Sequence, residues 1–238
     1  MIIEPLSIGR DVFEKRIASR YVLELLWKAH LQFEVSDMKY LYNLFQASTT
    51  VTASTGWIFE LRAHQLLARE KPIRSYRITQ DKPGTVKFIY GRYSGGRPKV
   101  LQSPGSGQVP FAKGEILRKT CYYRPSPTDF PDINSFILTH PRRSSPILVV
   151  FHVIWSAGEY HVSEDALKSI NTLPLPKNTR QYHVVVTPEG VQPVITVPKG
   201  HFEVGRGGGK KLSKKTFRVF NYPLSVDELF RGRSLGPV

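Results

Sequence analysis

The chain has 238 residues, of which 40% are hydrophobic and 11% aromatic, and its 34 basic and 19 acidic side chains give a formal charge of +15. This apolar content excludes a disordered chain and suffices for a buried core. The single cysteine, Cys121, excludes a disulfide framework and a thiolate zinc site built within one chain, and no apolar run approaches the roughly 20 residues of a membrane-spanning helix. The N-terminus lacks a secretory signal pattern, so we expect an intracellular protein without membrane contact.

The first 70 residues are predicted to form a helical layer. A helix is expected over residues 11–31, where Asp11 and Glu14 match a capping box and apolar residues recur every four positions. A second helix is expected to begin near residue 36, and a third to run over 54–70, before Pro72. These helices also offer a surface for a protein partner or a second copy in a homodimer.

Residues 72–124 change to a β pattern rich in basic side chains. The stretch GTVKFIYGRY (84–93) alternates apolar and polar residues as a half-buried strand does, and ILRKTCYYR (116–124) is a second candidate strand. A loop of Gly, Pro and Ser separates them. We therefore expect a hairpin-like basic β insertion.

Residues 125–200 are predicted to form an α/β core. A short strand (133–138) is followed by an apolar run (145–155) typical of a central strand buried on both faces, and their short link favours antiparallel pairing. A helix over 163–171, capped by Ser163, connects this run to a strand at 182–188, so the two longer strands should be parallel.

A further strand is expected in VITVPKG (194–200), and Ser225 with Glu228 should cap a last short helix in a basic tail, 201–238. The whole chain is therefore predicted to be a single α/β domain, 1–238, with a mixed sheet flanked by helices.

The positive charge is concentrated in two blocks. Residues 69–124 hold 13 basic and 3 acidic side chains, a net charge of +10, and residues 199–238 hold 9 and 3, a net charge of +6. Because Gly-flanked Lys and Arg beside Tyr and Phe suit a phosphate backbone, we expect binding of nucleic acid, with DNA favoured over RNA. The candidate contact residues are Arg92, Arg97, Lys99, Arg118, Lys119, Arg206, Lys210, Lys211, Lys214 and Lys215.

A solubilising surface, or a nuclear import signal in KKLSKK (210–215), is the alternative interpretation of this charge. Motifs for a phosphate-binding loop (GxxxxGK[ST]), a zinc protease (HExxH) and a nucleophile elbow (GxSxG) are absent from the sequence.

Three segments together suggest a metal-dependent phosphodiesterase core. They are the helix GWIFELRAHQLL (56–67) with Glu60, the turn and strand YYRPSPTDFPDINSFIL (122–138) with Asp132 and Asn134, and the strand ILVVFHVIW (147–155) with His152. In such a core, carboxylates hold Mg²⁺, which polarises the phosphate and activates a water.

The order GW-I-FE, then F-P-x-I-x-S-F-I-L, then an apolar strand reading F-x-V resembles the nuclease-like C-terminal domains of fungal Crinkler and retrotransposon-hot-spot type proteins. The resemblance covers roughly residues 15–200 and implies a restriction-endonuclease-like, PD-(D/E)XK fold and an effector-like role. It implies catalytic positions at Glu60, Asn134 and His152, of which only Glu60 carries the family's residue type, and we add Asp132 as a candidate catalytic residue and, with Glu60, as a candidate metal ligand.

The chain departs from that family at the positions that determine catalysis. The family carries Asp at the position of Asn134, and Gln or Glu, one residue, then Lys or Thr where this chain has His152, Val153 and Ile154. Asn lacks the charge that Mg²⁺ prefers, and Ile154 stabilises no phosphate charge. Asp132 would compensate for Asn134 if both lay in one strand, and His152 would serve as a base or as a ligand of Mn²⁺.

The prediction is therefore a nucleic-acid-binding protein on a catalytically degenerate nuclease fold. Its alternatives are an active Mg²⁺- or Mn²⁺-dependent nuclease with an altered site, and a protein-interaction module. For the individual residues, the competing interpretation is structural: a helix acid at Glu60 paired with Arg62 or Arg20, a strand-end cap at Asn134, and a hydrogen-bonded core histidine at His152.

Overall fold

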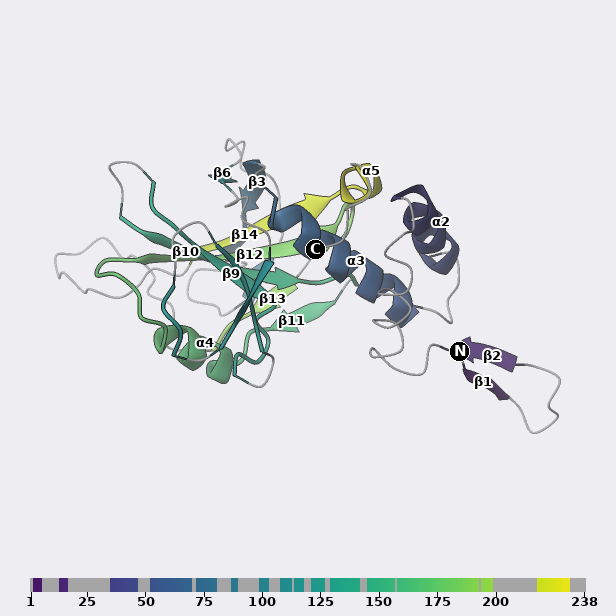
Figure 1. Ribbon diagram of the computed structural model, residues 1–238, viewed down its shortest axis with the longest axis horizontal. Coiled ribbons are helices and arrows are strands. Elements are labelled where there is room, and N and C mark those ends of the chain that lie inside the picture. Colours follow the sequence, from purple (N-terminus) through teal and green to yellow (C-terminus); the bar gives the residue numbers. More distant parts are fainter. Residues whose placement is uncertain are drawn as a thin grey trace. The chain divides into compact units, whose positions relative to one another are not determined.

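The computed structural model in Figure 1 divides the chain into two compact units. The first unit comprises residues 1–62 and 225–238, and the second comprises residues 63–224. The residues that the structure describes are 2–5, 13–16, 35–46, 52–69, 72–80, 87–89, 99–102, 108–112, 114–117, 121–126, 129–141, 145–156, 158–192, 194–198 and 218–231. None of the described helices is both long and apolar enough to cross a membrane.

The first unit begins with a two-stranded antiparallel sheet, in which β1 (Ile2–Pro5) pairs with β2 (Phe13–Arg16). The prediction of a helix over 11–31 is therefore wrong for residues 13–16, and residues 17–31 lie outside the described part of the chain. The partner strand β1 is rich in β-branched residues, and pairing with it outweighs the local helical spacing of apolar residues. The four-residue apolar period therefore does not predict the structure at residues 13–16.

The helices of the first unit confirm the other N-terminal predictions. They are α2 (Val35–Gln46), α3 (Thr52–Leu67) and α5 (Val226–Leu229). The boundary between the two units falls within α3, between Arg62 and Ala63. Ser225 caps α5, because its Oγ accepts a hydrogen bond from the N–H of Glu228 at 3.1 Å.

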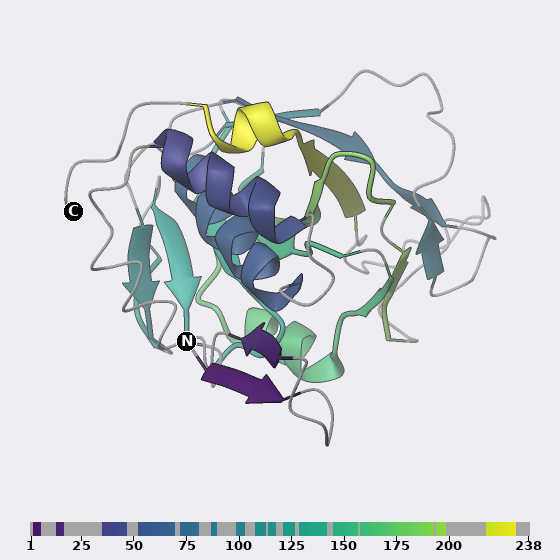
Figure 2. The ribbon, with the colours of Figure 1, turned by 90° about the vertical axis from the view of Figure 1, so that its right-hand side faces the viewer.

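Helices α2 and α5 lie side by side in Figure 2. The buried Tyr42 ring packs on Phe230 with ring centroids 5.3 Å apart, and Lys39 forms an ion pair with Asp227 at 2.6 Å. The Arg62 Nε donates to the carbonyl of Leu229. These contacts hold residues 225–231 to the N-terminal helices.

The second unit contains a mixed eight-stranded sheet in the order β6-β3-β14-β12-β10-β9-β8-β7. Three neighbouring strands at its centre run parallel, namely β10 (Ile147–Val153), β12 (Arg180–Pro188) and β14 (Arg218–Leu224). On the other side of β10, β9 (Ser135–Thr139) pairs with it antiparallel. The predicted antiparallel 133–138/147–155 pair and the parallel 147–155/182–188 pair are both confirmed.

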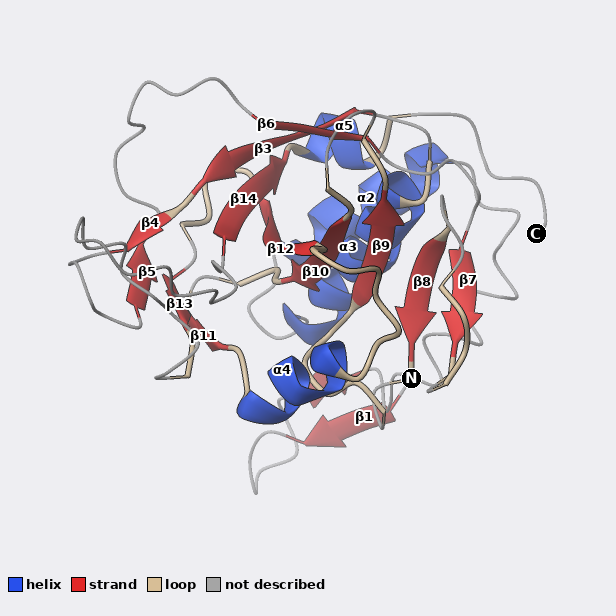
Figure 3. Cartoon of the chain, turned by 90° about the vertical axis from the view of Figure 1, so that its left-hand side faces the viewer, coloured by secondary structure: helices blue, strands red, loops and turns tan. Residues whose placement is uncertain are grey.

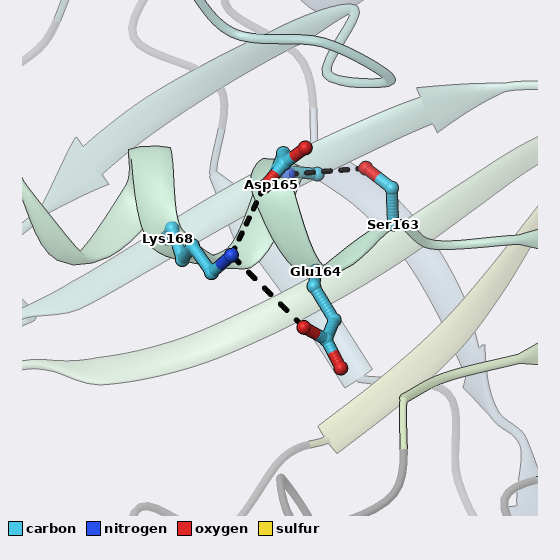
Figure 4. A network of polar contacts seen from close by, with 5 residues as sticks. Ser163, Glu164, Asp165 and Lys168 are labelled. Carbon is cyan, nitrogen blue, oxygen red and sulfur yellow. Dashed lines mark hydrogen bonds and ion pairs between the residues drawn. The ribbon is translucent and has the colours of Figure 1, made fainter.

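The connection from β10 to β12 passes through β11 (Glu159–His161) and α4 (Glu164–Asn171). Ser163 caps α4, since its Oγ accepts from the N–H of Ala166 at 3.1 Å, as the sequence predicts. Figure 4 shows this cap together with Lys168, which lies 3.1 Å from Asp165 and 4.0 Å from Glu164. The α/β fold class with its strand–helix–strand crossover is therefore confirmed.

The described strands of residues 72–124 belong to the two larger sheets of the second unit and not to a separate hairpin-like insertion. Strands β3 (Pro72–Arg77) and β6 (Lys99–Gln102) build one edge of the main sheet, and β8 (Tyr122–Pro125) and β7 (Gln108–Phe111) build the other. The alternation of buried Ile73, exposed Arg74 and buried Ser75 gives β3 one buried face. The end of β3 pairs antiparallel with β14.

The same basic block supplies half of a smaller sheet. Strands β4 (Thr79–Gln80) and β5 (Lys87–Ile89) continue into β13 (Val194–Thr196) and β11, in the order β11-β13-β5-β4. Figure 3 shows this four-stranded sheet beside the main sheet, with α4 below it. The predicted strand within 84–93 is confirmed for residues 87–89, and the strand in VITVPKG for 194–196; their flanks lie outside the described residues, except for residues 197 and 198.

One hydrophobic cluster of the second unit lies on the face of the main sheet that α4 covers. Leu148 and Val150 of β10 pack there with Ala166, Leu167 and Ile170 of α4. Toward the edge formed by β8 and β7, the fully buried Phe136 sits among three aromatic rings, from Phe111, Tyr123 and Phe130.

Candidate functional site

Three of the four predicted site residues come together where β10 ends. Asn134 precedes β9, Asp132 lies in the turn before it, and His152 is the penultimate residue of β10. Glu60 lies on the part of α3 that belongs to the first unit and is half-buried. Because the two units are described separately, the predicted convergence of Glu60 with the other three stays a prediction.

The amide of Asn134 extends the β9–β10 ladder. Backbone pairing between the strands ends at Ser135 and Phe151, and beyond it the Oδ1 of Asn134 accepts a hydrogen bond from the N–H of Val153 at 2.8 Å. The side-chain oxygen thus stands in for a backbone carbonyl. The interpretation of Asn134 as a strand-end cap is confirmed.

Asp132 occupies a turn, so the premise that it shares a strand with Asn134 is wrong. Its φ is +59°, a left-handed conformation that a β-strand does not contain, and the alternation of side chains along a strand therefore does not apply to it. The residue is exposed, while its backbone carbonyl turns inward and accepts a hydrogen bond from the Tyr160 hydroxyl at 2.8 Å.

His152 is buried in the core of the second unit, with 1% of its surface exposed. Its Nδ1 lies 3.1 Å from the carbonyl oxygen of Asp132 and 3.2 Å from the Tyr160 hydroxyl, and its Nε2 lies 3.0 Å from the Nδ1 of His183. The two imidazole rings stack with an interplanar angle of 12°. The interpretation of His152 as a hydrogen-bonded core histidine is confirmed.

The geometry assigns the protons of this pair. A carbonyl oxygen only accepts, so the Nδ1 of His152 carries a hydrogen and donates it to Asp132. In the neutral ring the Nε2 of His152 then accepts, which requires the Nδ1 of His183 to donate. A directed chain of hydrogen bonds therefore runs from β12 through β10 to the turn before β9.

Burial keeps both rings neutral. Desolvation lowers the pKa of His152 from its ordinary value of 6.5 to about 4, an effect that the carbonyl of Asp132 partly offsets. Desolvation, and then the neighbouring His152, lower the pKa of His183 well below 6.5. Burial and the nearby Asp132 also raise the pKa of the Tyr160 hydroxyl, so it remains protonated.

This arrangement is suited to fixing the fold and not to reacting with a ligand. Both ring nitrogens of His152 face protein groups, so neither presents a lone pair to a metal ion or to water. Within the described residues, no three His, Cys, Asp or Glu side chains are grouped so that they could hold a metal ion. The predicted pairing of Glu60 and Asp132 as metal ligands stays a prediction.

Removing both imidazoles should lower the free energy of unfolding less than removing one of them. His152→Leu leaves the Nδ1–H of His183 buried opposite an apolar group, which should lower the free energy of unfolding by about 1–3 kcal/mol. The double variant His152→Leu/His183→Leu removes both polar partners and should recover part of that loss. Urea unfolding of the wild type, both single variants and the double variant measures this coupling. Additive losses would show that the two rings do not interact.

A second buried polar chain crosses the opposite face of the sheet. The Tyr122 hydroxyl lies 2.6 Å from the Nδ1 of His64 and 2.6 Å from the Oγ of Ser135, and all three residues are fully buried. The sequence gives no signal for this chain, because its three members come from separate elements. His183 was missed as a partner of His152 for the same reason: the register of two parallel strands is not encoded locally.

The predicted nucleic-acid contacts fall mostly beyond the described residues. Lys99 lies at the start of the edge strand β6, opposite Ser75. The others lie outside the described residues, and their role stays a prediction; they are Arg92, Arg97, Arg118, Lys119, Arg206, Lys210, Lys211, Lys214 and Lys215.

Comparisons with known proteins identify no relative. No protein-family model, no curated protein and no solved structure matches the chain. The resemblance to Crinkler and retrotransposon-hot-spot type domains therefore stays a prediction that rests on the sequence motifs alone.

Proposed function

We propose that the chain is a nucleic-acid-binding protein on a restriction-endonuclease-like fold whose cleavage chemistry is degenerate. The observation that carries the proposal is the concentration of charge, +10 in residues 69–124 and +6 in residues 199–238, in a protein whose remaining residues are close to neutral. Neutralising phosphates releases condensed counterions, so clustered Lys and Arg favour a polyanion over other partners.

The lack of cleavage is supported by the site itself. Asn134 uses its side-chain oxygen to hold the N–H of Val153, and His152 uses both ring nitrogens inside the protein. Restriction-endonuclease-like catalysis needs a carboxylate at the first position, and a polar or charged group near the second, that reach a metal ion and the phosphate. These two residues have other partners.

Binding should depend steeply on salt and little on base sequence. Fluorescence anisotropy with labelled duplexes of about 20 base pairs, titrated between roughly 50 and 300 mM NaCl, measures the slope of log K against log salt, which should be several units. Two duplexes of unrelated sequence should bind alike. An affinity that ignores salt, or the absence of binding at the lowest salt, would refute the proposal.

The same duplexes, incubated with the protein and Mg²⁺ or Mn²⁺, test the proposal that the protein does not cleave nucleic acid. We expect no cleavage, because the two altered positions leave no metal site of the usual composition. Metal-dependent cleavage that is lost in both Glu60→Ala and Asp132→Ala would instead establish an active nuclease with an altered site.

A further inference from the structure

Acidic residues of the central part of the second unit gather at one edge of the sheet. We use the term carboxyl edge for the side of the main sheet at which β10, β12 and β14 end. Every acidic side chain between residues 125 and 224 that the structure describes either precedes β9 or follows β10 or β12 on this side. These residues are Asp129, Asp132, Glu159, Glu164, Asp165 and Glu189.

Basic residues occupy the opposite, amino edge, where the same three strands begin. Arg180 is the first residue of β12, opposite Ile147, and Arg218 is the first residue of β14, opposite Tyr182. Lys177 lies in the turn that leads into β12. No acidic residue lies at this edge within the described ranges 139–141, 145–147, 171–182 and 218–220.

Each of these basic residues is anchored by its surroundings. Lys177 sits in a turn closed by the N–H and hydroxyl of Thr179, which both donate to the carbonyl of Pro176, with Asn178 at a φ of +62°. The N–H of Arg180 donates to the carbonyl of Pro146 at 2.8 Å. The backbone thus presents two exposed cations at defined places.

Arg218 is braced by an aromatic side chain. Its guanidinium lies 5.8 Å from the centre of the Tyr182 ring, and its Nη1 donates to the Tyr182 hydroxyl at 3.5 Å. In register, Arg180, Tyr182 and Arg218 share one face of the sheet, since Arg180 and Tyr182 are two residues apart and Tyr182 pairs with Arg218. The amino edge therefore combines cations and an aromatic ring.

Resting on the proposed function, we propose that, in addition to the basic blocks 69–124 and 199–238, the nucleic-acid backbone is contacted at the amino edge by Lys177, Arg180 and Arg218, and not at the carboxyl edge. Six acidic residues at the carboxyl edge repel phosphates, whereas the described ranges 139–141, 145–147, 171–182 and 218–220 at the amino edge hold cations and no acid. The predicted site residues Asp132, Asn134 and His152 lie at the carboxyl edge, so bound DNA does not touch them.

Single alanine variants of the full chain test this assignment. Lys177→Ala and Arg180→Ala should each remove one phosphate contact, which weakens duplex binding about eightfold at 0.1 M salt and lowers the slope of log K against log salt by about 0.9. Both residues are exposed and the hydrogen bond of Arg180 is made by its backbone, so the fold should be unaffected. Circular dichroism of each variant checks this.

Lys168→Ala is the matched control. Lys168 carries the same charge and is also exposed, but on α4 it pairs with Glu164 and Asp165 (Figure 4), two of the acidic residues assigned above to the carboxyl edge. Its removal should leave affinity and slope unchanged. If the wild type binds with a steep slope but the double variant Lys177→Ala/Arg180→Ala keeps that slope, the amino-edge assignment is wrong and the proposed function stands. If the wild type does not bind at all, the proposed function itself fails.

Discussion

Lowering the pH from about 7 to about 4 should destabilise the second unit by roughly 3 kcal/mol through His152 alone, with a further loss from His183. In the folded protein the pKa of His152 is about 4, whereas in the unfolded chain it is near 6.5. Between these values the unfolded state binds more protons than the folded state. Stability is therefore greatest above pH 6.5 and falls as the pH drops toward 4.

Urea unfolding at a series of pH values measures this loss, and the double variant His152→Leu/His183→Leu isolates it from the titration of carboxylates. The variant has nothing to protonate at these two sites, so its free energy of unfolding should change less between pH 7 and pH 4 than that of the wild type, by roughly 3 kcal/mol or more. Equal pH profiles for the two proteins would show that the imidazoles are accessible to protons in the folded state and contradict the buried placement.

Elements whose signals are local were predictable from the sequence. The apolar run that forms β10 is too uniformly hydrophobic for a surface strand, and Ser163 and Ser225 mark the beginnings of α4 and α5 through their own hydroxyls. The pairing of β9 with β10 follows from the short link between them. In each case a few neighbouring residues determine the structure.

Elements that depend on distant partners were not predictable. β3 is a strand because β14, more than 140 positions further along the chain, pairs with it, and nothing in PIRSYR alone requires this. The site shows the same limit. Asn134 and His152 could be marked as departures from a catalytic pattern, but their actual roles depend on Val153 and on His183.

The aromatic cluster around Phe136 should be the most sensitive apolar part of the second unit. Phe136 is completely buried on β9, with its ring centroid 5.1 Å from that of Phe111, 5.5 Å from Tyr123 and 5.9 Å from Phe130. Phe136→Ala opens a cavity among rings that belong to three other segments, β7, β8 and the turn before β9. The free energy of unfolding of this variant should be lower than that of the wild type by about 3–5 kcal/mol.

Two further variants, Phe136→Leu and Ile116→Ala, distinguish the effect of the cavity on stability from the effect of losing apolar side-chain atoms in general. Leu fills most of the space left by the ring, so the loss should be only about 1–2 kcal/mol. Ile116 is 83% exposed, and its replacement by Ala should change stability by less than about 0.5 kcal/mol. Denaturant unfolding of the three variants gives this order. A Phe136→Ala loss as small as that of Ile116→Ala would show that the cluster is not packed in solution. The graded series would show that β9, whose entrance holds Asn134 and Asp132, is fixed by apolar packing of Phe136 as well as by the polar contacts beside it.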